Sequence, residues 1–418
     1  MTTGARIVLV LLLISVFAGA VTGSQIYYRL SYIWGFLLLG SWLWSKFMLR
    51  GVKLIRIPRS TRAQVGQVFE ERFELHNPGR LPRLWLAVRD AGTLPGSKGS
   101  RLFPYIEGRR GRTYIARSRL LQRGVYSLGP TTLEGGDPFG LFPVERTLSA
   151  SESLLVYPML FELQDFPSPS GIMPGGEALR RRTQQVTPNA SGVRDYYPGD
   201  PLNRIHWVST ARRGRLISKE FELDPQAEVW IFLDASQTGQ AAIPFTHNLD
   251  EAEDLWRKKA QINLPPTTEE YGVSIAASIG RYFLRLGRAV GFVSAGQSLS
   301  LLPADRGGRQ LGKMLEALAL IRAEGNLPIR GLVEAEAQNL ARGSTVVVIT
   351  HSVEEDVALM ADQINRRGLR PILVLLDAAS FNGPSGSDRL EAMLNFLKVP
   401  TRLVHRGDDL GQALSVRR

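Results

Sequence analysis

Two long apolar runs stand at the start of the chain. The first, IVLVLLLISVFAGAVTG, begins at Ile7, and the second, SYIWGFLLLGSWLWSKFML, begins at Ser31. Each approaches the roughly 20 apolar residues that a helix needs to cross a bilayer. The pattern predicts two transmembrane helices within residues 1–56. Alternatively, the first run is a cleaved signal peptide, because the small residues Ala18 to Ala20 resemble a cleavage site.

Basic residues near these runs predict the side of the membrane on which the soluble part lies. The stretch between the runs holds Arg29, whereas a cluster follows the second run: Lys46, Arg50, Lys53, Arg56 and Arg59. Basic residues stay on the cytoplasmic side of a membrane. We therefore expect a two-span protein of the cell membrane whose soluble domains are cytoplasmic.

Residues 57–160 carry the alternation of a strand-rich domain. VFEERFEL, which begins at Val68, places Phe69, Phe73 and Leu75 on one mostly apolar face. Further short runs are cut by Gly and Pro, as in HNPGRLP. Regular short strands with turn signals predict an antiparallel β-sandwich.

The remaining sequence divides into a connector and an α/β domain. Residues 161–193 are rich in Pro, Gly and Ser and then basic, which predicts a connector. Within 194–418, apolar runs such as EVWIFLDAS and STVVVITH alternate with amphipathic helical stretches. This order predicts a doubly wound, mainly parallel sheet covered by helices on both faces. Ligands of such sheets bind outside the carboxyl ends of the strands.

Composition limits the chemistry and the partners. The chain of 418 residues has 51 basic and 39 acidic side chains, a formal charge of +12, and no cysteine. The absence of cysteine excludes disulfides, zinc–thiolate sites and cysteine nucleophiles. The basic charge fits nucleic acid, an anionic membrane surface or an acidic protein.

The most unusual stretch is GVRDYYPGDPLNRIHWVSTARRGRLISKEFELD, from Gly192 to Asp224. Asp200 before Pro201 is typical of a helix start, and Gly214 of a helix end. The stretch is either a turn–helix–strand joint or a docking surface. The candidate binding residues in it are Asp200, Arg204, His206, Trp207, Arg212 and Arg213.

Asp234, Ser236 and Thr238 directly follow the first apolar strand of the α/β domain. A carboxylate and two hydroxyls on a strand-to-helix turn are the hard oxygen donors that Mg²⁺ prefers. These residues are candidate metal ligands, with Asp234 on the exposed rim of the sheet. His351, at the end of a later strand, is a further candidate for lining a site.

Several segments, in order, resemble one family. They are GVYSLGP with GGDPFGLF, LLVYP, VRDYYPGDPLNRIHWVSTARRGRLISKEFE and IFLDAS. The chain resembles the family catalogued as domain of unknown function fifty-eight. The resemblance implies a von Willebrand factor type A-like carboxyl-terminal domain and a MoxR-type AAA+ ATPase as partner. It also implies a metal-ion-dependent adhesion site at Asp234, Ser236 and Thr238, for which Asp305 is a nearby oxygen donor.

The sequence therefore predicts a membrane-anchored adaptor that binds a protein partner in the assembly or maturation of other proteins. No catalytic motif was found, so an enzyme is not expected. The alternatives are a metal-assisted hydrolase, whose base would be His351 or Asp305, and a basic nucleic-acid-binding protein. Nucleic acid is the less expected partner, because the membrane-proximal residues account for much of the basic charge.

Overall fold

A computed structural model describes residues 2–149, 152–167, 190–197, 205–221, 228–245 and 264–415. The chain forms two compact units, each of which combines segments that are separate in sequence. Unit 1 comprises Met1–Leu160, Ile243–Ala277 and Leu315–Ile321; unit 2 comprises Phe161–Ala242, Ser278–Met314 and Arg322–Arg418. The predicted segments 1–56 and 57–160 thus lie in one unit.

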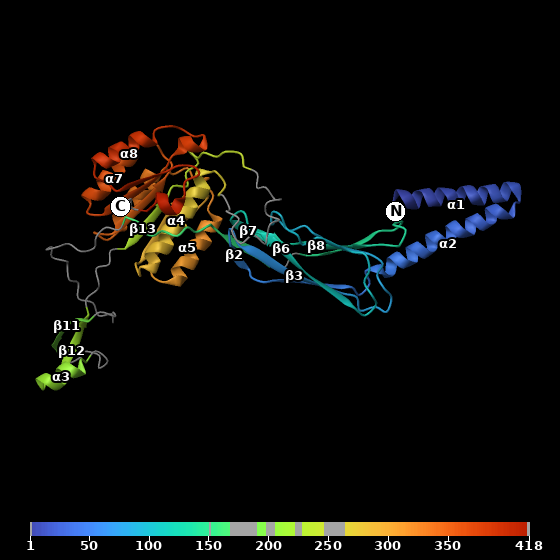
Figure 1. Cartoon of the computed structure of the whole chain (residues 1–418), viewed down its shortest axis with the longest axis horizontal. Coiled ribbons are helices and arrows are strands. Elements are labelled where there is room, and N and C mark those ends of the chain that lie inside the picture. Colours follow the sequence, from blue (N-terminus) through green and yellow to red (C-terminus); the bar gives the residue numbers. More distant parts are fainter. Residues whose placement is uncertain are drawn as a thin grey trace. The chain divides into compact units, whose positions relative to one another are not determined.

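Unit 1 begins with an antiparallel pair of helices, α1 (Thr3–Thr22) and α2 (Gln25–Met48), which lie side by side (Figure 1). The helix α1 ends at Gly23, whose φ of 68° is the left-handed conformation that glycine adopts readily. Within the described residues, α1 is the one helix that is long and apolar enough to cross a membrane. The second predicted run does form a helix, but it is less apolar than α1.

The helix pair buries small side chains and exposes large apolar ones, which inverts the arrangement that is usual in water. Ser15 and Gly19 of α1 and Ser41 and Ser45 of α2 are buried. Large apolar side chains point outward instead, and Phe36 is 72% exposed. Small residues let two helices approach closely, which is how helices pack when their outer surface is not in water.

The strand-rich part of unit 1 has three sheets, with strand orders β1-β3-β6, β5-β4-β8-β9 and β2-β10-β7. This confirms the predicted run of short strands. The predicted antiparallel pairing is wrong for β2 and β10, which are parallel because a long intervening segment lets the chain return in the same direction. The strands are β1 (Lys53–Pro58), β2 (Arg62–Gln64), β3 (Val68–His76), β4 (Leu86–Asp90), β5 (Arg101–Phe103), β6 (Gly111–Arg119), β7 (Gly124–Leu128), β8 (Thr131–Gly135), β9 (Val144–Leu148) and β10 (Glu152–Tyr157).

Alternation along β3 builds the core between these sheets. Phe69, Phe73 and Leu75 are buried, as the sequence pattern predicts, and Phe73 stacks on Tyr114 of β6 with ring centroids 4.9 Å apart. Glu71 lies on the same inward face and is 1% exposed. A carboxylate in this position requires a buried partner, which is described below.

Unit 2 contains a six-stranded sheet of order β15-β14-β13-β16-β17-β18. All neighbouring pairs are parallel except β14 with β15, so the sheet is mixed with an antiparallel strand at one edge. The mainly parallel α/β arrangement predicted from the sequence is thereby confirmed. The strands are β13 (Val229–Leu233), β14 (Val290–Ala295), β15 (Leu299–Asp305), β16 (Thr345–Thr350), β17 (Arg370–Leu376) and β18 (Thr401–Val404).

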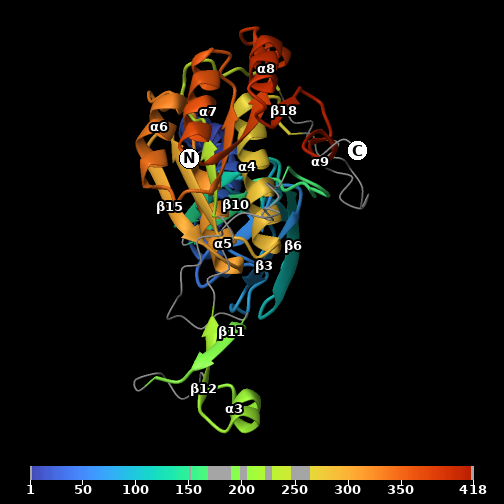
Figure 2. The same ribbon diagram turned by 90° about the vertical axis from the view of Figure 1, so that its left-hand side faces the viewer.

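Helices cover both faces of this sheet (Figures 1 and 2). On one face, Val333 and Met360 of two helices pack in a cluster with Phe232 of β13. On the other face, a Cβ at Gly280 would lie 2.5 Å from the sulfur of Met314 and 3.7 Å from Ile231, so glycine permits this close packing. The helices are α4 (Thr268–Arg285), α5 (Gly308–Leu320), α6 (Ile329–Glu336), η3 (Ala337–Asn339), α7 (Asp356–Arg366), η4 (Ala378–Phe381), α8 (Ser387–Phe396) and α9 (Leu410–Ala413).

A small module precedes the sheet in sequence. It consists of β11 (Ala190–Asp195), the short helix α3 (Trp207–Arg213) and β12 (Ile217–Phe221), with β11 and β12 antiparallel. The predicted connector therefore ends in a strand. The other connector residues, 168–189, lie outside the described residues.

Candidate functional site

The residue Asp234 lies where the strand order of the sheet reverses. It follows β13, whose neighbours are β14 on one side and β16 on the other. Its backbone N–H donates to the carbonyl of Ile349 in β16 at 2.9 Å. Asp234 thus occupies the carboxyl edge of the parallel strands, as predicted, at the kind of point where α/β proteins bind ligands.

Both oxygens of the Asp234 carboxylate accept hydrogen bonds from the chain itself. Oδ1 accepts from the hydroxyl of Ser236 at 2.7 Å and from its backbone N–H at 3.1 Å. Oδ2 accepts from the hydroxyl of Thr350 at 2.6 Å. The carboxylate therefore joins the loop after β13 to the last residue of β16.

His351 lies against the same loop and is 2% exposed. Its Nε2 is 3.0 Å from the carbonyl oxygen of Thr238, and its Nδ1 is 3.8 Å from Oδ2 of Asp234. Gln240 lies 3.4 Å from Nδ1. The ring thus packs between the loop and the strand end, with both nitrogens facing groups of this chain.

Gly325 closes the loop from the other side. Its backbone N–H donates to the carbonyl of Ala235 at 3.0 Å, and its carbonyl accepts from Gln237 at 2.7 Å. A Cβ at this position would lie 2.0 Å from the carbonyl oxygen of Ala295. Only glycine leaves room for this contact between the loops that follow β13 and β14.

The structure corrects two expectations about this site, the exposure of Asp234 and the position of Asp305. Asp234 does not lie on an exposed rim, because its side chain is 2% exposed. Thr238, a predicted metal ligand, is exposed, and the two hydroxyls that donate to Asp234 belong to Ser236 and Thr350. Asp305 pairs with Val290 at the amino end of β14, because β15 runs antiparallel and carries its last residue to the opposite edge of the sheet.

The geometry around Asp234 fits the ligand set predicted for Mg²⁺ poorly. Asp234 supplies one carboxylate, and both of its oxygens are already engaged by hydroxyl and backbone donors. Among the described residues, no group of three or more His, Asp or Glu side chains is placed to hold a metal. Mg²⁺ affinity depends on the number and charge of its oxygen ligands. Mg²⁺ binding stays a prediction.

Four candidate binding residues of the stretch from Gly192 to Asp224 lie in or directly before α3: His206, Trp207, Arg212 and Arg213. His206 begins α3, where its Nδ1 accepts from the backbone N–H of Ser209 at 3.2 Å. Gly214 ends the helix with a φ of 67°, as predicted. The helix α3 starts at Trp207. A helix start was predicted at Asp200, but Asp200 and Arg204 lie outside the described residues.

This module exposes large and basic side chains. Trp207 is 65% exposed and Val208 is 59% exposed, and none of the α3 residues is buried. Arg212 and Arg213 in the last turn of α3 are also exposed. Where burial is described in the module, Ile205 and Ile217 are buried, at 3% and 0% exposure. The surface of α3 is therefore apolar at its start and cationic at its end.

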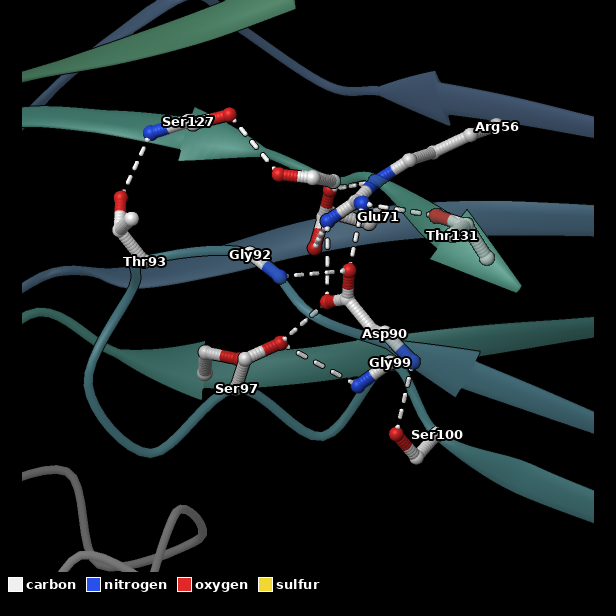
Figure 3. Close-up of polar contacts among 12 residues, drawn as sticks. Arg56, Glu71, Asp90, Gly92, Thr93, Ser97, Gly99, Ser100, Ser127 and Thr131 are labelled. Atoms are coloured by element: carbon white, nitrogen blue, oxygen red, sulfur yellow. Dashed lines mark hydrogen bonds and ion pairs between the residues drawn. The ribbon is translucent and has the colours of Figure 1, made fainter. Parts of the chain in front are cut away.

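A second buried polar cluster lies in unit 1 and joins β1, β3 and β4 (Figure 3). The guanidinium of Arg56 donates to both oxygens of Glu71 at 2.7 and 3.0 Å, and to both oxygens of Asp90 at 2.8 and 3.2 Å. Asp90 also accepts from Gly92 and Ser97. Glu71 and Asp90 side chains are each 1% exposed, so one arginine neutralises one of two buried charges.

Burial affects the protonation of this cluster. Removal from water raises the pKa of the Glu71 carboxyl above its ordinary value, and the hydrogen bonds and charge of Arg56 offset this only in part. Burial alone would lower the pKa of Arg56, but its contacts with Glu71 and Asp90 outweigh that and raise it. Arg56 was predicted to be one of the membrane-proximal cations, and the one sequence signal of its buried role is Glu71 on an otherwise apolar strand face.

The fold and these sites define a protein with an apolar amino-terminal helix, strand-rich sheets and a mixed α/β sheet. The family described as "Protein of unknown function DUF58" matches residues 192–244, which include α3, β12, β13 and Asp234. This match confirms the family resemblance. The chain is also 23% identical over 372 residues to the "Uncharacterized protein YeaD" of Bacillus subtilis (strain 168), covering 85% of this chain and 84% of that protein.

Comparison with solved structures finds weaker similarity. A CARDB domain of a Pyrococcus furiosus protein, crystallised with di-metal ions, is 10% identical; the match covers 25% of this chain and 91% of that one, with a TM-score of 0.18. An exo β-N-acetylglucosaminidase from Vibrio harveyi is 10% identical over 86% of this chain and 60% of that one, with a TM-score of 0.17.

Proposed function

We propose that this protein is anchored in the cell membrane by the α1–α2 pair and acts there as a protein-binding adaptor. The observation that carries the proposal is the inverted packing of this pair, which buries Ser15, Gly19 and Ser41 and exposes large apolar side chains. In water such an arrangement would leave a large apolar surface unburied, whereas in a bilayer it is the favoured one.

Length and charge support two spans. At 1.5 Å per residue, the 20 residues of α1 extend over about 30 Å, which matches the hydrocarbon core of a bilayer. The longer α2 carries Trp42 near its end, with the ammonium of Lys46 4.1 Å from the ring centroid. Tryptophan and lysine are typical of a membrane interface. The basic residues that follow α2 favour a cytoplasmic location for both soluble units.

For the docking surface, we propose the exposed face of α3. Trp207 and Val208 offer an apolar contact, and Arg212 and Arg213 offer charge-assisted bonds to acidic groups. The resemblance to the family makes a MoxR-type AAA+ ATPase the expected partner. The same resemblance, with a strand order that reverses at β13, supports a von Willebrand factor type A-like assignment of the sheet.

A pull-down tests this proposal. The full chain in detergent should retain a MoxR-type ATPase, and Arg212→Glu with Arg213→Glu should abolish retention. The matched control is Arg306→Glu with Arg309→Glu, which makes the same charge change at exposed positions in and beside α5. Equal retention by both double variants would remove α3 from the interface.

The alternative functions have less support. A hydrolase would need an accessible base, but His351 is buried and Asp305 lies at the opposite edge of the sheet from Asp234. Nucleic-acid binding is motivated by the formal charge of +12. Steep salt dependence of DNA or RNA binding by the full chain would favour that alternative over a protein partner.

A further inference from the structure

Two loops of the strand-rich region are hydrogen-bonded to the ends of the α1–α2 pair, within unit 1 (Figure 1). In the loop between β8 and β9, the carbonyls of Gly140 and Leu141 accept from the hydroxyl of Thr2, at the start of α1, at 3.2 and 3.0 Å. The carbonyl of Phe142 accepts from the hydroxyl of Ser45, in the last turn of α2, at 2.5 Å. This loop therefore bridges both helices.

The loop between β3 and β4 contacts the end of α2. Arg83, which is 6% exposed, donates to the carbonyl of Phe47 at 2.6 Å and to that of Arg50 at 3.2 Å. Phe47 lies in the last turn of α2, where its carbonyl also accepts from the backbone N–H of Arg50 at 3.3 Å, and a cation there complements the helix dipole. The contact fixes the second loop at the same end of the helix pair as the first.

Each loop presents one large apolar side chain to its surroundings. Phe139 is 67% exposed and Leu81 is 58% exposed. Their backbones are held rigidly: the buried Asp137 accepts from the N–H of Phe139 at 3.0 Å, and the buried Asn77 donates to the carbonyl of Leu81 at 3.0 Å. The exposed position of Phe139 and Leu81 is therefore set by the turn, because a buried polar side chain is hydrogen-bonded to the backbone of each residue.

We infer that Phe139 and Leu81 insert into the bilayer interface and seat the strand-rich region directly on the membrane surface. The inference rests on the proposed membrane location of the α1–α2 pair. Because both loops are bonded to the ends of these helices, their tips lie at the level where the helices leave the bilayer. Exposed basic residues next to apolar ones are typical of segments that bind anionic membrane surfaces, and here Arg80 directly precedes Leu81 and Arg6 lies in the first turn of α1.

The bilayer is favoured over a protein partner by continuity with the helix pair. Phe47, at the end of α2, is 43% exposed and belongs to the lipid-facing side of the pair. The carbonyl of Phe47 is the acceptor of the bond from Arg83, so the loop with Leu81 begins where the lipid-facing surface ends. The tips extend an existing apolar surface instead of forming a separate one.

Depth-dependent quenching tests this inference on the full chain. The protein has no cysteine, so single cysteines can be introduced and labelled with an environment-sensitive fluorophore. The chain is reconstituted into vesicles of phosphatidylcholine and phosphatidylglycerol with brominated acyl chains. The labelled variants are Phe139→Cys and Leu81→Cys for the tips, Phe36→Cys for the helix pair, and Val125→Cys as the control.

Val125 is a matched control because it is apolar and 53% exposed, and it lies on β7, at the end of the strand-rich region away from α1 and α2 (Figure 1). We expect strong quenching at Phe36, intermediate quenching at both tips, and none at Val125. Quenching at Phe36 but at neither tip would overturn the inference and leave the membrane anchor intact. Absence of quenching at Phe36 would refute the membrane anchor itself.

Discussion

The buried arginine of unit 1 gives the sharpest prediction of stability. Arg56→Met keeps the length and much of the apolar contact of the side chain with the ring of Phe73, which lies 5.1 Å from the guanidinium. It removes five hydrogen bonds, four to Glu71 and Asp90 and one to Thr131, and the positive charge between the two carboxylates. Two carboxylates that are each 1% exposed then face each other without a cation.

The expected cost follows from the chemistry of buried charges. Removing one partner of a buried ion pair costs about 3–5 kcal/mol, because the remaining charge stays out of water without compensation. A change of this size corresponds to roughly a 10²- to 10³-fold increase in local opening, at about 1.4 kcal/mol for each factor of ten. The opening should affect β1, β3 and β4 together, since the cluster joins these strands.

Amide hydrogen exchange of the full chain in detergent measures this opening strand by strand. The matched control is Arg59→Met, which removes an ion pair with Glu70 from a side chain that is 77% exposed. An exposed pair contributes about 0–1 kcal/mol, so exchange should change little. The triple variant Arg56→Met, Glu71→Gln, Asp90→Asn should recover most of the protection, because it leaves no charge buried.

Equal exchange in Arg56→Met and Arg59→Met would refute this reasoning, since it would mean that the cluster is hydrated in solution. Loss of protection that the triple variant does not recover would point instead to lost packing of the arginine stem. The comparison thus separates the buried charge from the volume of the side chain.

Three further predictions concern pH, the loop after β13 and glycine packing. Because burial raises the pKa of Glu71 in the folded state above the ordinary value of 4.5, its contribution to stability is complete below that pH and is lost as pH rises through the folded value. Urea denaturation should therefore show a fall in the free energy of unfolding above about pH 4.5 that Glu71→Gln lacks; parallel pH profiles would contradict it. Asp234→Ala should lower the free energy of unfolding by about 3 kcal/mol, because the hydroxyls of Ser236 and Thr350 lose a buried acceptor. Thermal melting checks this value, and a large rise of the wild-type midpoint with millimolar Mg²⁺ would show a metal site instead. Gly325→Ala should destabilise unit 2 by about 3 kcal/mol or more, since its Cβ would overlap the carbonyl of Ala295, whereas Gly312→Ala, with open space around it in a helix, should be neutral or stabilising; similar melting temperatures for the two variants would refute the contact.

Local periodicity determined which elements this chain forms. The alternation in VFEERFEL produced the strand β3 and its buried face, and the continuous apolar run in STVVVITH produced the buried strand β16. The helix α3 ends at Gly214, as the sequence predicted, and this glycine has a left-handed φ of 67°. These features depend on the period of side-chain burial and on backbone preferences, which are properties of neighbouring residues.

Only the tertiary structure decided which polar groups meet. The hydroxyl of Thr350 donates to Asp234, because β16 lies beside β13 although more than a hundred residues separate the two strands. Asp305 lies at the edge of the sheet opposite Asp234, because β15 runs antiparallel to β14. Arg56, predicted to be a membrane-proximal cation, instead donates hydrogen bonds to Glu71 and Asp90 in the core of unit 1. Burial and pairing depend on chain segments distant in sequence, and this is why a one-dimensional pattern locates the strands but not the chemistry between them.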